Sequence, residues 1–279
     1  MDFRQKGCIR NGRYVKLMRM LKLDQLKSDL KENGVIVIPG FFERKLIEDI
    51  QLAAKHIFQI QFDHLGIKGD YLSQMTQLFQ NHLDTFISCG KLIQTGLVEL
   101  YQLSVNPELI ELVKNLGLSK PLMCTRPMLF FNHPNLAMSE HFYKTPLHQD
   151  WVSMLASQDS IVVWFPLIDL EIGHGPVIFY PGSHKLGPLT DKLENGFAEV
   201  PFDRSAFPKL QPEVNMGDIV IFSTLLVHES GVITNNQIRW SSHLRYTNME
   251  DVDFIERGFP SPYINKPSQE LIDKYLHKK

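Results

Sequence analysis

The sequence contains no uninterrupted apolar run long enough for a transmembrane helix, and its beginning lacks the apolar core of a secretory signal. We therefore expect no insertion into a membrane. Cysteine is scarce: Cys8, Cys89 and Cys124 are odd in number and widely spaced, which excludes a disulfide framework and predicts reduced thiols in a cytoplasmic protein. An excess of one charge is also absent, because a formal net charge of −2 offers no general attraction to nucleic acid.

Internal repeats, low-complexity tracts and linker-like segments are absent as well. With 43% hydrophobic and 22% charged residues, the composition is that of an ordinary globular protein. We predict one domain over residues 1–279, in which residues 1–121 are mostly helical, residues 122–250 form a β-rich core and residues 251–279 are a C-terminal extension. A basic excess in residues 1–22 is interpreted as a solvated chain end rather than a targeting segment.

Periodicity in the first part predicts helices around a single strand. Apolar residues recur at helical spacing over residues 23–33, and Gly34 is placed to end that helix. A short apolar run at residues 35–38 predicts a buried strand. Further helices are predicted over residues 41–62 and 106–117, and residues 71–104 are predicted to be mostly helical. Asn106-Pro107, a capping residue followed by a first-turn proline, opens the last of them.

The second part changes to short β-rich runs separated by glycine, proline, asparagine and aspartate. Runs of this length and spacing are typical of a β-sandwich or barrel. The predicted strands cover residues 122–131, 160–169, 176–181, 218–226 and 238–247.

The sequence indicates a possible metal site that involves His148-Gln149-Asp150, His228 and Arg239. Two imidazoles and one carboxylate are the ligand set that holds non-haem iron(II) on one face and leaves positions open opposite. Because His148 and Asp150 are two residues apart, their side chains point to the same side of a β-strand. His228 is predicted to end the apolar strand over residues 219–227. Arg239 follows eleven residues later, where its guanidinium could bind a carboxylate beside the metal.

Each feature also has a plainer interpretation. A His-X-Asp triplet occurs by chance, and a histidine at a strand end is more often an ordinary polar residue. Arg239 could lie on the surface, as most arginines do. Ser230, two residues after His228, could be a turn residue, and Trp164 could be a core indole. The combination carries more weight than its parts, because one site accounts for all of them.

The order of motifs resembles the phytanoyl-CoA dioxygenase family of iron(II)- and 2-oxoglutarate-dependent oxygenases. The motifs are "PLHQD" from Pro146, "GPVIFYPGSH" from Gly175, "GD" at Gly217 and "HES" at His228. The resemblance covers about residues 30–250. It implies a double-stranded β-helix, the jelly-roll core of cupin-like proteins, with the N-terminal helices packed on it.

The resemblance also implies roles for the candidate residues. His148, Asp150 and His228 would bind iron(II), and Arg239 with Ser230 would hold the far carboxylate of 2-oxoglutarate, with dioxygen as the second cosubstrate. Further residues expected at the cosubstrate site are Trp164, Gln149 and Met128. The candidates for substrate contacts are Trp151, Met154, Phe130 and Arg245. His243 has no partner at a useful spacing in the sequence.

The implied reaction is hydroxylation of a C–H bond in a small or medium-sized organic molecule, with succinate and carbon dioxide as co-products. Related halogenases carry glycine or alanine where Asp150 stands, so chlorination is not expected. Desaturation, cyclisation and epimerisation use the same ligands and stay as alternatives. So does a catalytically silent jelly-roll binding protein. A zinc hydrolase would leave Arg239 and Ser230 without a purpose, and a cupin-like isomerase usually has more histidine ligands. The sequence leaves the oligomeric state open.

Overall fold

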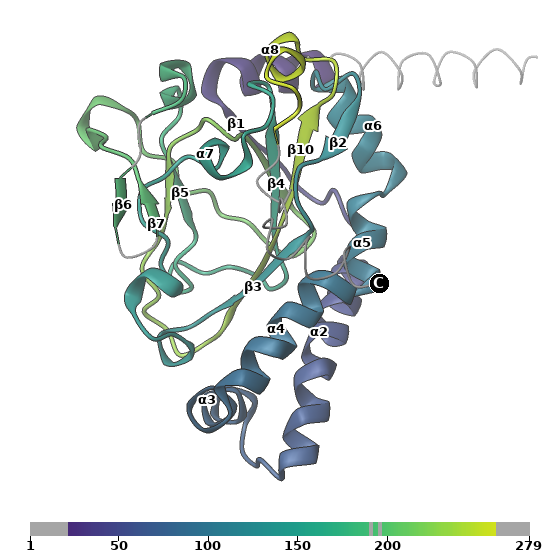
Figure 1. Ribbon diagram of the computed structural model, residues 1–279, viewed down its shortest axis with the longest axis vertical. Coiled ribbons are helices and arrows are strands. Elements are labelled where there is room, and N and C mark those ends of the chain that lie inside the picture. The colour runs from purple at the N-terminus through teal and green to yellow at the C-terminus, as the bar shows by residue number, and fades with distance from the viewer. Residues whose placement is uncertain (1–21, 190–191, 195–196, 261–279) are drawn as a thin grey trace, which may run out of the picture.

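The computed structural model describes residues 22–189, 192–194 and 197–260. Three antiparallel sheets form the β-structure of the described residues, and helices cover the outer face of the largest one (Figure 1). The larger sheet has the order β1-β8-β4-β10-β2, with β3 also paired to β10. Its strands are β1 Val35–Ile38, β2 Pro121–Met123, β3 Met128–Asn132, β4 Ile161–Pro166, β8 Ile219–Ser223 and β10 Arg239–Asn248. The smaller sheet pairs β5 Val177–Phe179 with β9 His228–Ser230, and β6 Lys192–Glu194 pairs with β7 Phe197–Glu199.

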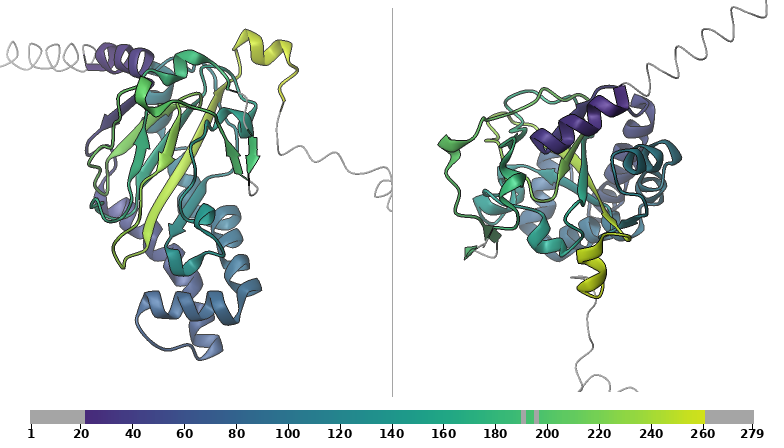
Figure 2. Two further views of the ribbon diagram at one scale, coloured as in Figure 1. Left: turned by 90° about the vertical axis from the view of Figure 1, so that its left-hand side faces the viewer. Right: turned by 90° about the horizontal axis from the view of Figure 1, so that it is seen from above.

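The helices lie mainly in the first part of the chain, as predicted. One helix covers residues 22–33 and lies across the top of the sheets in the view of Figure 2 (right). The others are α2 Arg44–Leu65, α3 Tyr71–Asn81, α4 Leu83–Gly96, α5 Val98–Ser104, α6 Pro107–Asn115, α7 Trp151–Met154 and α8 Val252–Glu256. Short 3-10 turns are η1 Pro134–Leu136, η2 Glu140–Phe142, η3 Ser183–Leu186 and η4 Arg204–Ala206.

Strict alternation along the strands divides the core into two layers. On β4, Ile161, Val163 and Phe165 join the cluster that packs under the helices, whereas Val162 and Trp164 join the cluster shared with β5. The same division holds on β1 and β8. Because successive side chains of a strand point to opposite faces, β1, β4 and β8 are apolar on both sides. The middle of the larger sheet is therefore buried on both faces.

Local signals account for the helix ends. Gly34 ends the first helix in a left-handed conformation (φ +75°), and an added Cβ there would lie 2.4 Å from His184 Nδ1. Asp70 caps α3 by accepting from Ser73 N. The Asn106 side chain accepts from Glu108 N and Leu109 N at the start of α6, which confirms the predicted cap.

Some predicted boundaries were wrong. The stretch over residues 71–104 is mostly helical, as predicted, but it divides into three helices, because the chain turns at His82 and at Leu97. The run at 122–131 is two strands, β2 and β3. The strand predicted over 219–227 ends at Ser223, and residues 224–227 carry the chain across to the other sheet, so His228 begins β9 rather than ending β8.

Parts of the predictions fall on residues that the structure does not describe. The basic segment over residues 1–21, Cys8 and residues 261–279 of the predicted extension are among them. Cys89 and Cys124 carry free thiols, as predicted. Within residues 22–189, 192–194 and 197–260, no helix has the length and apolar character needed to cross a bilayer.

Candidate metal centre

The structure brings His148, Asp150 and His228 together, although 80 residues separate the two histidines. The backbones of His148 and His228 form an isolated antiparallel bridge, with N–O distances of 3.0 and 3.1 Å in the two directions. The two imidazole rings lie 4.1 Å apart between centroids, and His148 Nε2 lies 3.7 Å from Asp150 Oδ1. One potential ligand atom from each residue lies within 4.8 Å of the others, so the three groups could hold one metal ion.

Both imidazoles are oriented by hydrogen bonds of the same kind. His148 Nδ1 lies 2.7 Å from Pro146 O, and His228 Nδ1 lies 2.9 Å from Leu226 O. A carbonyl can only accept, so each Nδ1 carries the proton and each Nε2 has a free lone pair. Carbonyl partners of this type orient metal-binding histidines and strengthen their donor atoms. The donor set thus fits a divalent ion of intermediate hardness such as iron(II).

The charge states also suit metal binding. Burial, together with the adjacent His148 ring, lowers the pKa of His228 to about 3, so its imidazole is neutral at neutral pH. Burial would raise the pKa of the Asp150 carboxyl, but the Arg245 guanidinium and the two imidazoles outweigh it and hold that pKa well below its usual value. A neutral imidazole and an ionised carboxylate are the forms that coordinate metals.

Arg245 contacts the candidate metal ligand Asp150 and does not only line the cavity. Its Nε is 3.3 Å from Asp150 Oδ2, and its Nη2 is 3.2 Å from Asp150 Oδ1. Both side chains are about nine-tenths buried or more. A guanidinium that contacts both oxygens fixes the carboxylate plane, as the carbonyls fix the imidazole rings. Arg245, expected as a substrate contact, is therefore placed to orient Asp150.

Arg239 is buried without an acidic partner. It is 4% exposed, and no carboxylate of the described residues lies within ion-pair distance of it. Its Nη1 donates to Gly175 O, its Nη2 lies 3.4 Å from Ser230 Oγ, and its Nε has no partner. Burial lowers its pKa to about 10, so the guanidinium is still charged at neutral pH. A desolvated cation with an unused donor is a site for an anion, and the carboxylate of 2-oxoglutarate fits it.

The metal ligands and Arg239 line one cavity of about 280 Å³. Alternate residues of β10 form one of its walls: Arg239, Ser241, His243 and Arg245. Of the other expected residues, Ser230, Trp164 and Phe130 also line it. His243 was missed by sequence reasoning, although counting in twos from Arg239 along the predicted strand would have found it.

Four expected site residues lie elsewhere. Gln149 points away from its neighbours and donates to Leu225 O and Gly187 O, so it holds loops together. Trp151 donates to Ala156 O, and Met154 lines a different cavity beside α8. The reason is local: Asp150 leads directly into α7, so the residues after it do not continue a strand. Met128, on β3, is not among the residues that line the metal cavity.

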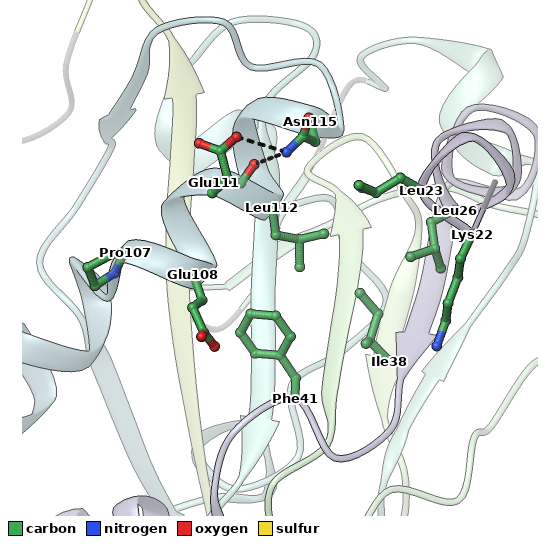
Figure 3. A pocket seen from close by; sticks show the side chains of 10 residues that line it. All are labelled: Lys22, Leu23, Leu26, Ile38, Phe41, Pro107, Glu108, Glu111, Leu112 and Asn115. Carbon is green, nitrogen blue, oxygen red and sulfur yellow. Dashed lines mark hydrogen bonds between the residues drawn. The ribbon is translucent and has the colours of Figure 1, made fainter. Parts of the chain in front are cut away.

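Another cavity is larger, with a volume of about 530 Å³ (Figure 3). It lies between the helix over residues 22–33, β1 and α6, and Leu26, Ile38, Phe41 and Leu112 point into it. Glu111 and Asn115 on its rim are hydrogen-bonded to each other. It contains neither histidine nor an arginine, and it shares no residue with the metal cavity.

Comparison with known proteins agrees with this geometry. The model of the phytanoyl-CoA dioxygenase family matches residues 30–241. A 1-deoxypentalenic acid 11-beta-hydroxylase from Streptomyces exfoliatus is 24% identical over 211 residues, which are 71% of each chain, and its namesake from Streptomyces arenae is 23% identical over 215 residues, again 71% of each.

Solved structures share the fold. The epimerase SnoN from nogalamycin biosynthesis, in complex with Fe³⁺, alpha ketoglutarate and nogalamycin RO, superimposes with a TM-score of 0.55 at 16% identity, covering 82% of this chain and 84% of that one. EctD from S. alaskensis, with 2-oxoglutarate and 5-hydroxyectoine, gives a TM-score of 0.53 at 14% identity and covers 81% and 76%. The predicted double-stranded β-helix with N-terminal helices is confirmed.

Proposed function

The chain belongs to the phytanoyl-CoA dioxygenase family of iron(II)- and 2-oxoglutarate-dependent oxygenases, and we propose that it hydroxylates a C–H bond of a small or medium-sized organic molecule. The reaction consumes 2-oxoglutarate and dioxygen and releases succinate and carbon dioxide. One oxygen atom of dioxygen enters the new hydroxyl group and the other enters succinate.

One observation carries the proposal: a three-ligand metal site and a buried arginine without an acidic partner line the same cavity. A hydrolase or a simple metal-binding protein has no use for the second feature. A cosubstrate that must bind the metal at one end and a cation at the other needs both.

The roles of the residues follow from their contacts. His148, Asp150 and His228 would hold iron(II), which supplies the dioxygen chemistry that no side chain provides. Arg245 keeps the Asp150 carboxylate in place. Arg239 would bind the far carboxylate of 2-oxoglutarate, with the Ser230 hydroxyl beside it.

Backbone and apolar groups complete this cosubstrate end of the cavity. Gly175 O accepts from Arg239 and directs its guanidinium. Trp164 and Val177 form apolar wall and reduce the access of water to the charged groups.

The type of oxidation follows from Asp150 and from the position of the substrate. An ionised Asp150 occupies the ligand position that a halide would need, so we predict that added chloride is not incorporated. The relatives and neighbours are named as hydroxylases, an epimerase and a carbocyclase. Desaturation, cyclisation and epimerisation therefore stay as the alternatives that the product analysis must separate. The cytoplasmic location also stays a prediction.

The test is a reaction reconstituted with iron(II) under anaerobic conditions and started with ¹⁸O₂ in the presence of chloride. A panel of apolar carboxylic acids that includes 1-deoxypentalenic acid serves as the substrate set. We expect succinate to form in step with a product that carries one ¹⁸O atom. A chlorinated product, or a product formed without consumption of 2-oxoglutarate, overturns the proposal.

Matched histidine variants separate the metal site from general effects. His228→Ala should lose metal and turnover, whereas His56→Ala, which removes an exposed histidine on α2, should keep both. Metal analysis of the protein as purified distinguishes iron from zinc. Wild-type turnover in His228→Ala would show that the metal is bound elsewhere.

A further inference from the structure

A second cavity borders the metal cavity. It has a volume of about 340 Å³ and lies between α3, α4, β3 and residues 136–142. We call it the apolar annex; its wall includes Phe79, Ile87, Met138 and Phe142. Phe130 and Asn132 of β3 line both cavities, so the two cavities adjoin at these residues.

The position of β3 explains this arrangement. Among the described strands β3 pairs only with β10, so its other edge is free. Phe130 and Asn132 stand on the same face of β3, because they are two residues apart. The Phe130 ring lies 5.0 Å from the His243 ring, which lines the metal cavity from β10. The two cavities therefore meet at Phe130 and Asn132, whereas Leu129 and Phe131, on the other face of β3, line the annex alone.

The lining of the apolar annex contains no charged residue. Its polar members are Gln94 and Asn132, and both amides are engaged: Gln94 Nε2 lies 3.5 Å from Leu129 O, and Asn132 Nδ2 lies 3.5 Å from Phe142 O. The remaining lining residues are apolar or aromatic. The chemistry of the annex therefore suits a hydrocarbon surface and offers no partner to an ionic group.

Large apolar side chains remain exposed at the rim. Met138 is 75% exposed, Phe142 62% and Ile87 42%. Scattered exposed apolar residues are normal, but here three of them line one cavity, which shares Phe130 and Asn132 with the metal cavity. Such a rim is typical of a surface that is covered when an apolar molecule binds.

Volume gives the second argument. Pockets that hold drug-sized molecules usually measure about 300–1,000 Å³, and the metal cavity, at about 280 Å³, is just below that range. 2-Oxoglutarate must lie between the metal ligands and Arg239 and would take much of this space. A substrate with a sizeable carbon skeleton needs further room, and the adjoining annex supplies it.

We propose that the apolar annex holds the uncharged hydrocarbon skeleton of the substrate, whose reacting C–H bond passes between Phe130 and Asn132 toward the metal. This inference rests on the proposed function, and it names the substrate class as molecules with an extended apolar portion. Phe130 then decides how far the skeleton can advance, and the residues at the annex floor decide its size.

The first test measures binding in the annex without turnover. N-phenyl-1-naphthylamine, an uncharged dye that fluoresces in apolar surroundings, is titrated into metal-free protein and displaced with decanol. Ala137 lines the annex with an extended backbone, so Ala137→Trp fills it without backbone strain. Ile87→Lys places a charge at its exposed rim. We expect both variants to weaken dye binding at least about tenfold, whereas Leu52→Trp, at an exposed site on α2, leaves it unchanged.

The second test asks whether the bound molecule approaches the metal. Decanol with a terminal trifluoromethyl group is added to protein loaded with manganese(II) or with zinc(II), and ¹⁹F relaxation is recorded. We expect faster relaxation in the manganese form, which is lost in Ala137→Trp. Equal relaxation in the two metal forms overturns the proposal, as does unchanged dye binding in both annex variants.

Separate readouts distinguish this inference from the proposed function. Stabilisation of the nickel(II) form by 2-oxoglutarate reports on the proposed function alone and should survive in both annex variants. If that stabilisation is absent in the wild type, the proposed function fails whatever the dye does. Light scattering tests whether a second copy of the chain covers the annex instead. If the protein is a dimer that Met138→Glu separates into monomers, the annex is an interface between copies and the proposal is overturned.

Discussion

Arg239 allows the sharpest test of the site, because a role in binding 2-oxoglutarate and a purely structural role predict opposite results for its substitution. The guanidinium is buried, charged and without an acidic partner among the described residues. Its replacement by methionine keeps most of the volume and removes the charge. If the arginine exists to bind 2-oxoglutarate, the unligated protein should tolerate Arg239→Met, since a desolvated cation is lost. The substitution leaves the acceptors Gly175 O and Ser230 Oγ without this donor, and we expect the resulting loss of unfolding free energy to be only about 1–3 kcal/mol.

The effect on the cosubstrate should be much larger. Loss of one partner of a buried charge pair costs about 2–5 kcal/mol, and about 1.4 kcal/mol is a factor of ten in affinity. The dissociation constant of 2-oxoglutarate should thus rise at least about thirtyfold. At a concentration of about 100 times the wild-type constant, the ligand stabilises the wild type by about 2.7 kcal/mol and the variant by less than about 1 kcal/mol.

The assay is thermal unfolding of the nickel(II) form with and without 2-oxoglutarate. For a chain of this size about 1 kcal/mol corresponds to roughly 2–4 °C in Tm, so the difference is easily measured. Arg44→Met is the control, because Arg44 forms an exposed pair with Asp169 that contributes little to stability. A full 2-oxoglutarate shift in Arg239→Met would refute the reasoning. So would a variant that unfolds before ligand is added, since the arginine would then be structural.

Three further predictions follow from neighbouring contacts. Arg245→Met leaves the buried Asp150 carboxylate unpaired, so chemical denaturation of the metal-free protein should show a loss of about 3–5 kcal/mol that nickel(II) partly restores; a loss below about 1 kcal/mol would contradict the ion pair. Gly175→Ala places a Cβ 2.6 Å from Gly231 O at φ +64°, and it should lower Tm and weaken 2-oxoglutarate binding, because the carbonyl that directs Arg239 moves. An unchanged affinity would show that this carbonyl is dispensable. Because burial lowers the pKa of Arg239 to about 10, the cation that binds 2-oxoglutarate is present below that pH and lost above it. Calorimetric affinity should therefore be constant between about pH 7 and pH 9 and fall beyond; a fall already near neutral pH would indicate another titrating group.

Much of the layout was readable from local patterns. The helix ends at Gly34 and at Asn106-Pro107 are determined by the residues at those positions, so the sequence alone predicts them well. The same is true of the central strands, whose short apolar runs indicate buried strands. Boundaries such as the break at His82 were missed, because both sides of it have helical periodicity.

The identity of the ligands was also present in the sequence, because chemistry limits which residues hold such a metal. His148, Asp150 and His228 follow from residue type and motif order, and their closeness is what the structure adds. A bridge between the backbones of His148 and His228 joins segments that no local signal connects. The strand expected to hold His148 and Asp150 is a single bridge at His148, and α7 begins directly after Asp150, which is why Trp151 and Met154 lie elsewhere.

Residue types and their order thus determined the fold class and the kind of chemistry, since both depend on short-range patterns and on ligand preference. Only the tertiary structure decided which groups surround those ligands. Arg245 meets Asp150, and Gly175 O meets Arg239, because separate strands and loops converge there. The apolar annex likewise exists because α3, α4 and the free edge of β3 come together without filling the space between them. Contacts of this kind depend on packing across long sequence separations, for which a single sequence carries no direct signal.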